Sequence, residues 1–246
     1  MITSKALAER LAVAADFRPE DGHGREWARR EVLGLAKKLR GTGVYLKVNS
    51  ALRAEGYRLV EEIREWELKV FADLKLFDIH HTLFTDGVLL HEVKPELLTV
   101  MCMAGISSLQ ALKIELPETE ILGVTTLTSM KDSDTQRMFG CSVEESVMRF
   151  AQIAVDAKVD GLVCAPAEAA MLRQKFSEKL SLNTPDVRPT WAHVRGDDQN
   201  YRRVMTPAEA ITAGATRLVV GRPITQAKNP YDAVMRILEE IASTIS

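Results

Sequence analysis

The stretch VFADLKLFDI, residues 70–79, combines the pattern of a buried strand with charges near its end. The alternation of side chains along a strand places three apolar residues on one face: Val70, Ala72 and Leu74. Phe71, Asp73 and Lys75 then share the opposite face. Ionised side chains are costly to bury, whereas parallel α/β proteins bind their ligands at the carboxyl ends of their strands. The stretch therefore predicts a parallel α/β fold with an active site at this end of the strand.

Similar β-rich runs occur along the whole chain, and helical patterns lie between them. The predicted strands are Leu11–Asp16, Val44–Val48, Lys69–Lys75, Leu97–Met101, Glu120–Thr128, Gly161–Ala165, Leu180–Thr184 and Arg217–Gly221. The predicted helices are Arg25–Leu39, Leu52–Trp66, Thr82–Val93, Ser107–Leu116, Val143–Ala157, Glu168–Phe176, Pro207–Ala213 and Tyr231–Ser243. This strict alternation predicts an α/β fold of the (β/α)8 TIM-barrel type, with residues 1–246 forming a single domain. A doubly wound open sheet is the competing fold, but no glycine-rich dinucleotide motif follows the first predicted strand.

The composition argues against several classes of partner. The chain has 246 residues, of which 46% are hydrophobic and 27% charged, and its formal net charge is −2. Basic residues are spread along the chain, so we expect neither nucleic acid nor an anionic membrane surface as a partner. No apolar run approaches the roughly 18 residues that span a bilayer, and the N-terminus lacks a signal-peptide pattern. The 3 cysteines fit neither a disulfide framework nor a zinc site. The sequence therefore predicts a cytoplasmic protein.

Further charged residues are expected at the same end of the predicted barrel. On the second strand, Lys47 faces inward and lies beside Asp73 of the third strand. Asp16 ends the first strand, and Asp78 follows the third strand in the next loop. A structural ion-pair network is the alternative interpretation, because such networks also place charges close together. The gathering of all these residues at the ligand-binding rim favours an active site.

The motif Asp73-x-Lys75-x-x-Asp78-Ile79-x-x-Thr82 resembles the active-site motif of the orotidine 5'-monophosphate decarboxylase family. Lys47 stands where that family has its first catalytic lysine, and Asp16 matches the aspartate of its first strand. Further segments that resemble the family are Val124–Met130, Thr184–Pro189, Gly196–Gln199, Arg203–Pro207 and Gly221–Thr225. The resemblance thus runs through most of the chain.

The resemblance implies an enzyme that decarboxylates orotidine 5'-monophosphate (OMP) to UMP, the last step of de novo UMP biosynthesis, with no metal or cofactor. Its catalytic residues would be Lys75, as proton donor to C6 of the pyrimidine, Asp73, against the substrate carboxylate, and Lys47 and Asp78, which complete an alternating charge array. Asp78 would reach across from the partner subunit of a homodimer. The substrate-binding residues would be Asp16 and Thr82 near the ribose, Thr128 and Ser129 at the pyrimidine, and Arg188, Gln199, Gly221 and Arg222 at the 5'-phosphate.

Several positions depart from the family pattern, and two other functions stay open. Asp186 and Asn49 stand where the family commonly has glycine, and Met101 stands where a histidine is frequent. One alternative is a magnesium-dependent phosphosugar decarboxylase or lyase of the same superfamily, although those enzymes usually carry an acidic ligand at the position of Lys47. The other alternative is a non-catalytic module that binds the phosphate of a nucleotide.

Overall fold

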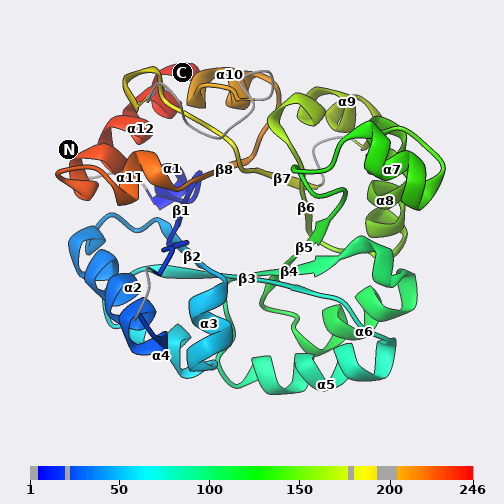
Figure 1. The fold of residues 1–246 in the computed structure, drawn as a ribbon, viewed down its shortest axis with the longest axis horizontal. Helices are drawn as coiled ribbons and strands as arrows, with labels where there is room; N and C mark the ends of the chain where they lie inside the picture. Colours follow the sequence, from blue (N-terminus) through cyan, green and yellow to red (C-terminus); the bar gives the residue numbers. More distant parts are fainter. Residues whose placement is uncertain (1–4, 20–22, 177–179, 193–203, 246) are drawn as a thin grey trace.

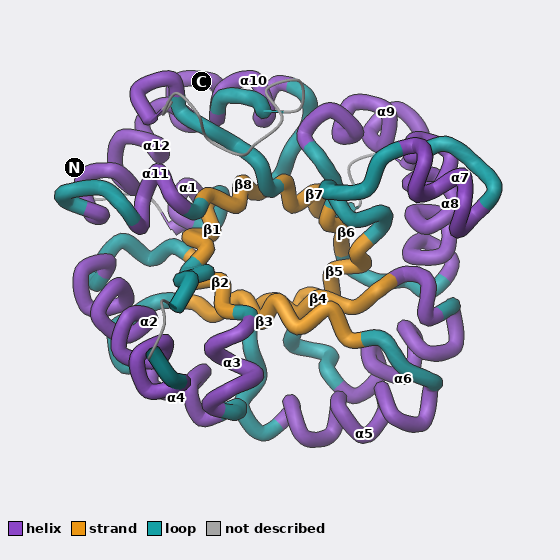
Figure 2. The backbone as a smooth tube through the Cα atoms, in the orientation of Figure 1, coloured by secondary structure: helices purple, strands orange, loops and turns teal. Residues whose placement is uncertain are grey.

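The computed structural model describes residues 5–19, 23–176, 180–192 and 204–245. Within these residues, strands β1 to β8 form a closed barrel in which each strand pairs in parallel with the next and β8 returns to β1. The strands are β1 (Leu11–Ala14), β2 (Tyr45–Val48), β3 (Lys69–Leu76), β4 (Leu97–Met101), β5 (Glu120–Val124), β6 (Gly161–Val163), β7 (Ser181–Thr184) and β8 (Arg217–Val220). Figure 1 and Figure 2 show the ring of strands surrounded by helices, which confirms the predicted TIM barrel.

Helices follow the strands in the predicted alternation. The α-helices are α1 (Lys5–Ala8), α2 (Arg25–Leu39), α3 (Ser50–Glu55), α4 (Arg58–Arg64), α5 (His80–His91), α6 (Ile106–Glu115), α7 (Asp132–Phe139), α8 (Val143–Asp156), α9 (Pro166–Phe176), α10 (Pro207–Thr212), α11 (Arg222–Thr225) and α12 (Pro230–Ile245). Two short 3-10 helices are η1 (Cys102–Ala104) and η2 (Thr190–Ala192).

Some predicted boundaries are wrong for identifiable reasons. The helix predicted over Leu52–Trp66 is split into α3 and α4, because Gly56 between them has a φ of 80°, a conformation outside the helical region. The strand predicted over Glu120–Thr128 ends at Val124. Beyond it, Thr125 N donates to Val163 O at 3.4 Å, and the hydroxyl groups of Thr125 and Thr126 bond to Val163 O and to Ser146. Side-chain contacts therefore help to hold this segment after the strand ends.

The two faces of the strands belong to two separate hydrophobic clusters. Outward-facing residues such as Val70, Ala72 and Leu74 pack with the apolar faces of the helices. Inward-facing residues fill the barrel itself: Ala12, Ala14, Tyr45, Phe71, Leu97, Leu122 and Val219. The predicted period of two in β3 is therefore confirmed, with Phe71 inside the barrel and its neighbours outside.

The pairing of β3 with β4 is irregular near the carboxyl end. Phe71 and Ala72 pair with Leu97 and Leu98, but the next pair is Leu76 with Val100. Residues 73–75 therefore form a bulge opposite Thr99. Lys75, inside the bulge, has a φ of 49°, which is uncommon for a residue other than glycine. Bulges beside active sites redirect side chains, and this one carries Asp73 and Lys75.

Two further expectations concern the cysteines and membrane helices. Cys102, Cys141 and Cys164 are all buried and form no disulfide. In the described part of the chain, no helix combines the length and the apolar character needed to cross a membrane.

Candidate active site

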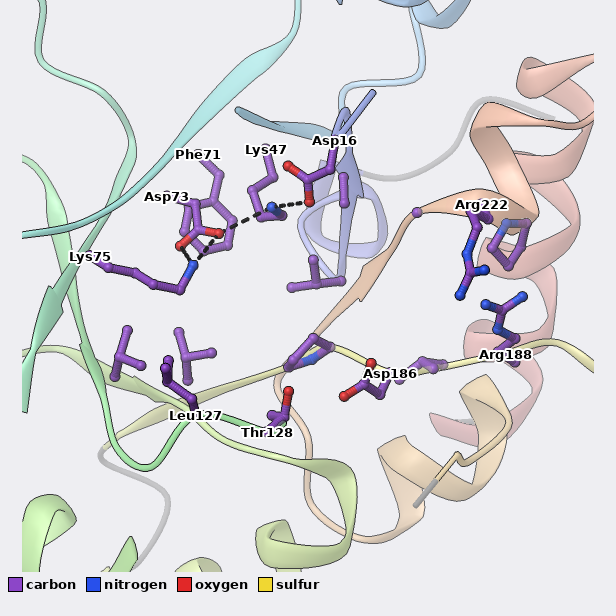
Figure 3. Close-up of a pocket in the computed structure, with 18 of the residues that line it drawn as sticks. Asp16, Lys47, Phe71, Asp73, Lys75, Leu127, Thr128, Asp186, Arg188 and Arg222 are labelled. Carbon is purple, nitrogen blue, oxygen red and sulfur yellow. Dashed lines mark hydrogen bonds and ion pairs between the residues drawn. The ribbon is translucent and has the colours of Figure 1, made fainter. Parts of the chain in front are cut away.

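A cavity of about 380 Å³ opens at the carboxyl ends of the strands. Residues from most of the barrel contribute to its wall, as Figure 3 shows. The predicted site residues that line it are Asp16, Lys47, Asp73, Lys75, Thr128, Arg188, Gly221 and Arg222. The fold thus brings together groups from β2 and β3 and from the segments that follow β1, β5, β7 and β8, which lie far apart in the sequence.

One end of the cavity carries a chain of alternating charges. The ammonium group of Lys47 donates to Asp16 Oδ2 at 2.6 Å and to Asp73 Oδ2 at 3.1 Å. The ammonium group of Lys75 lies 2.7 Å from both oxygens of Asp73. Figure 3 shows these contacts as one connected line from Asp16 to Lys75. The order of charges is therefore carboxylate, ammonium, carboxylate, ammonium.

Burial differs along this chain of charges. The side chains of Lys47 and Asp73 are only 8% and 9% exposed, whereas those of Lys75 and Asp16 are 30% and 53% exposed. The two inner groups are thus held within the protein, because each is compensated by the other. The outer groups face the cavity and can contact a ligand.

The ionised state of Asp73 is stabilised by its donors. Burial by itself raises the pKa of the Asp73 carboxyl, but the ammonium groups of Lys47 and Lys75 lower this pKa to about 2. Thr99 Oγ1 also donates to Asp73 Oδ1 at 3.0 Å, and Asn49 Nδ2 lies 3.5 Å from Asp73 Oδ2. Asp73 is therefore a carboxylate at neutral pH.

The inner lysine is also charged. Burial lowers the pKa of the Lys47 ammonium, but the carboxylates of Asp73 and Asp16 outweigh this effect and raise the pKa above its ordinary value. An ammonium group therefore stands on β2, between two carboxylates. Among the residues that the structure describes, no group of three or more His, Cys, Asp or Glu side chains could hold a metal ion.

The opposite end of the cavity carries two guanidinium groups. Arg188 follows β7 and is buried, whereas Arg222 begins α11 after β8 and is exposed. Figure 3 shows both side chains across the cavity from Lys75. Guanidinium groups bind phosphate through paired hydrogen bonds, and loops after the seventh and eighth strands of such barrels frequently bind phosphate. This end of the cavity suits a phosphate group.

Three predicted site residues that the structure describes do not line the cavity of a single chain: Asp78, Thr82 and Ser129. Asp78 is exposed in the loop before α5, and its Oδ1 accepts a hydrogen bond from Ile79 N at 2.7 Å. Thr82 lies in the first turn of α5, and Ser129 is exposed beyond Thr128. Gln199 lies outside the described residues. The roles expected for these residues stay predictions.

A comparison of the sequence with models of known protein families identifies one family over most of the chain. The model of the family described as "Orotidine 5'-phosphate decarboxylase / HUMPS family" matches residues 9–237. The chain belongs to this family. The match includes every residue of the alternating charge chain and both arginines of the cavity.

Individual members of the family are similar over nearly their whole length. The orotidine 5'-phosphate decarboxylase of Neisseria meningitidis serogroup C (strain 053442) is 34% identical over 239 residues, which cover 95% of this chain and 92% of the relative. The enzyme of the same name from Alkalilimnicola ehrlichii is 36% identical over 241 residues, covering 95% and 97%. The crystal structure of orotidine 5'-phosphate decarboxylase from Lactobacillus acidophilus has a TM-score of 0.78 and 25% identity, and the match covers 95% of this chain and 99% of that one.

Two positions that depart from the orotidine 5'-phosphate decarboxylase family pattern have a structural explanation here. Asp186 lines the cavity and has a φ of 61°, a left-handed conformation that glycine adopts freely and that aspartate tolerates better than most residues. Asn49 directs its amide nitrogen toward Asp73. Asp186 therefore lies in the wall of the cavity, and Asn49 lies beside its charged cluster.

The sequence interpretation did not identify Thr99 as a site residue. Thr99 is fully buried, and its hydroxyl bridges Asp73 and the backbone of Lys75. A signal was present, because alternation along Leu97–Met101 places Thr99 on the inward face, two residues after Leu97. The bulge that brings it to Asp73 has no such signature in the sequence.

Proposed function

We propose that this protein is a carboxy-lyase that converts OMP to UMP with neither a metal nor an organic cofactor. The observation that carries the proposal is the distribution of charge along one cavity, with the Lys47–Asp73–Lys75 cluster at one end and Arg188 and Arg222 at the other. OMP carries a carboxylate on its pyrimidine and a phosphate at the far end of the nucleotide. The names of the relatives, orotidine 5'-phosphate decarboxylase, support the same reaction.

Fixed charges supply what this reaction needs. Loss of carbon dioxide leaves an electron pair on C6 of the pyrimidine, where no neighbouring carbonyl can delocalise it. The Lys75 ammonium, which borders the cavity, stabilises this developing carbanion and then protonates it. Two unit charges about 4 Å apart interact by roughly 4 kcal/mol at an effective dielectric of 20. An interaction of that size made only in the transition state accelerates the reaction about a thousandfold.

Asp73 has a second part in this mechanism. Its carboxylate remains ionised because Lys47 and Lys75 lower its pKa, so it repels the carboxylate of bound OMP. The repulsion raises the energy of bound OMP. It is relieved as the substrate carboxylate becomes neutral carbon dioxide, so the transition state lies closer in energy to the bound substrate. Asp73 also positions the Lys75 ammonium, through the two 2.7 Å contacts.

Arg188 and Arg222 bind the phosphate, away from the bond that breaks. Binding energy from such a remote group can be used to hold the reacting ring against the charged cluster. Thr128, on the wall between the two ends, contacts the pyrimidine, and Gly221 completes the phosphate site. Asp16 contacts the ribose through Oδ1, because Lys47 binds Oδ2 of this carboxylate.

The site is completed by a second copy of the chain. Asp78 lies between Phe77 and Ile79, whose exposed fractions are 58% and 67%. Further exposed apolar side chains lie on α5, in η1 and at the start of α6: Phe84, Val88, Met103 and Ile106. Helices α5 and α6 lie side by side in Figure 1, and such an apolar surface favours association. A homodimer through this surface would carry Asp78 and Thr82 into the partner's cavity.

Subunit mixing tests this assembly. Lys75→Ala and Asp78→Asn chains, each inactive alone, are combined so that mixed dimers form. If Asp78 acts in the partner's cavity, each mixed dimer has one complete site, and part of the activity returns. Absence of recovery in verified mixed dimers would contradict a shared site.

Release of carbon dioxide from OMP, measured in the presence of EDTA, tests the proposed reaction. We expect undiminished turnover, because Lys47 provides the positive charge between Asp16 and Asp73 and would repel a divalent cation. Activity that EDTA abolishes and magnesium restores would favour the phosphosugar lyase alternative. Binding of UMP with no consumption of OMP would favour the non-catalytic alternative. The place of the reaction as the last step of de novo UMP biosynthesis, and a cytoplasmic location, belong to the same proposal.

A further inference from the structure

We propose that Thr99 is a positioning residue that holds Asp73 and Lys75 in their working geometry. The proposal rests on the proposed function, because it concerns the same charged cluster. Thr99 is the residue of β4 that faces the bulge of β3, where pairing skips from Ala72 with Leu98 to Leu76 with Val100. It therefore lies at the one place in this strand pair where the regular ladder is interrupted.

The hydroxyl group of Thr99 connects the two residues of the bulge. Lys75 N donates to Thr99 Oγ1 at 2.8 Å, and Thr99 Oγ1 donates to Asp73 Oδ1 at 3.0 Å. One hydroxyl thus acts as acceptor toward the backbone of Lys75 and as donor toward the carboxylate of Asp73. Hydrogen bonds arranged in such a sequence polarise and strengthen one another.

The backbone of Lys75 needs this support. Its φ of 49° lies in the left-handed region, which is unfavourable for a non-glycine residue and persists only where neighbouring contacts enforce it. This conformation determines where the side chain of Lys75 leaves the backbone. The hydrogen bond from Lys75 N to Thr99 is therefore one of the contacts that aim the ammonium at Asp73 and the cavity.

Thr99 itself is held by its surroundings. It is fully buried, and its position in β4 is fixed by pairing with Leu122 of β5. Water therefore has no direct access to replace its hydroxyl. Removing the hydroxyl leaves the partly buried backbone N–H of Lys75 without this partner and removes one of the donors to Asp73, so the bulge is expected to relax.

Kinetic comparison of Thr99→Val and Thr99→Ser tests the proposal. Valine keeps the shape and removes the hydroxyl, whereas serine keeps the hydroxyl. We expect Thr99→Val to lower kcat for OMP about 10- to 100-fold, the effect of a displacement on the order of 1 Å. KM and the affinity for UMP should change little, and Thr99→Ser should recover most of kcat. An unchanged kcat in Thr99→Val, or an equal loss in both variants, overturns the proposal.

Thr119→Val is the matched control. Thr119 is also buried, and its hydroxyl donates to Pro95 O at 2.8 Å, next to the amino end of β5. Its loss should lower stability without the selective fall in kcat. Should Thr99→Val fail to fold, Thr99→Ala compared with Thr99→Ser provides the same contrast.

The proposed function and the role of Thr99 can fail separately. If the wild-type protein releases no carbon dioxide from OMP, the proposed function is wrong. Crystal structures of the wild type, Thr99→Val and Thr99→Ser then decide the positioning role. The positioning role is supported if the Lys75 φ changes or the Lys75–Asp73 contact breaks in Thr99→Val but not in Thr99→Ser. An unaltered bulge in Thr99→Val overturns that role.

Discussion

The two ends of the barrel carry similar charged residues but use them differently. At the amino end, the guanidinium of Arg217 is enclosed by protein groups. It donates to Glu9 O at 3.0 Å and to Glu120 Oε2 at 3.1 Å, also bonds to Asn183, and lies 4.6 Å from the centre of the Tyr45 ring. At the carboxyl end, Lys75 and Asp16 border an open cavity. Charges satisfied by protein stabilise the fold, whereas charges facing a cavity can act on a ligand.

Strand β3 shows the contrast within a single element. Its inward face begins with Lys69 and ends with Lys75, with Phe71 and Asp73 between them. Lys69 forms an ion pair with Glu9 and lies over the ring of Tyr45. A lysine therefore forms structural contacts at the amino end of β3, and another lysine borders the candidate active site at the carboxyl end. The position along the strand, rather than the charge, distinguishes the roles of Lys69 and Lys75.

The largest effect is expected from Lys75→Ala. Turnover of OMP should fall at least about a thousandfold, since roughly 4 kcal/mol of transition-state stabilisation is lost. The variant should fold and still bind UMP. Lys69→Ala is the matched control on the same face of β3 and should retain kcat although its stability falls. Steady-state kinetics of both variants checks the comparison, and normal turnover of Lys75→Ala would refute the role assigned to that lysine.

Arg217→Met should affect stability instead of turnover. The substitution removes the partner of Glu120 and Asn183, and we expect the free energy of unfolding to fall by about 3 kcal/mol, as is common when one partner of a buried ion pair is removed. Glu120 is 26% exposed, which limits the loss. Urea denaturation measures it, with kcat of the residual folded protein as the second measurement. A large fall in kcat at unchanged stability would show that the amino end is not purely structural.

The charge of Asp73 should make stability depend on pH in the acid range. Its pKa is about 2 in the folded protein against an ordinary 3.8, so the ionised form stabilises the fold by about 2 kcal/mol. This contribution is complete above pH 4 and is lost as the pH falls toward 2. Urea denaturation of the wild type and Asp73→Asn from pH 5 to pH 2.5 should show their difference shrinking as the pH falls. A constant difference would mean that the pKa of Asp73 is not lowered.

Arg222→Ala should have the smallest effect, confined to the phosphate. The side chain is exposed, and a hydrogen bond to a charged group contributes about 1.5 kcal/mol at the low end of its range. The affinity for UMP should therefore fall about tenfold. Calorimetric titration with UMP and with uridine, which lacks the phosphate, separates the contributions. Equal weakening of both ligands would contradict a phosphate contact.

Local sequence patterns were sufficient for most of the barrel. The predictions for Leu97–Met101 and Arg25–Leu39 agree residue for residue with β4 and α2. Errors occur where contacts with distant segments determine the local structure. One example is Thr126, whose hydroxyl bonds to Ser146 on α8. The polar helix α7 was not predicted, because it lacks the apolar stripe on which such a prediction depends, and Thr135 is its buried residue.

The candidate site was predicted in part for the same reason. Lys47, Asp73 and Lys75 were expected together, because parallel strands end at the same side of a barrel, and the cavity contains all of them. Asn49 and Thr99 could not be assigned to Asp73 in advance. Their contacts depend on the exact positions of three strands relative to one another, which no single segment encodes.

Residue patterns within single segments predict the alternation of strands and helices, the inward direction of the charged residues and the family to which the chain belongs. Each of these follows from the period of side chains along one segment or from residue identities within a motif. The bulge of residues 73–75 opposite Thr99 and the left-handed backbone of Lys75 depend instead on contacts between distant segments. The register between β3 and β4 is set by packing across the whole barrel, and that packing involves residues from all parts of the chain.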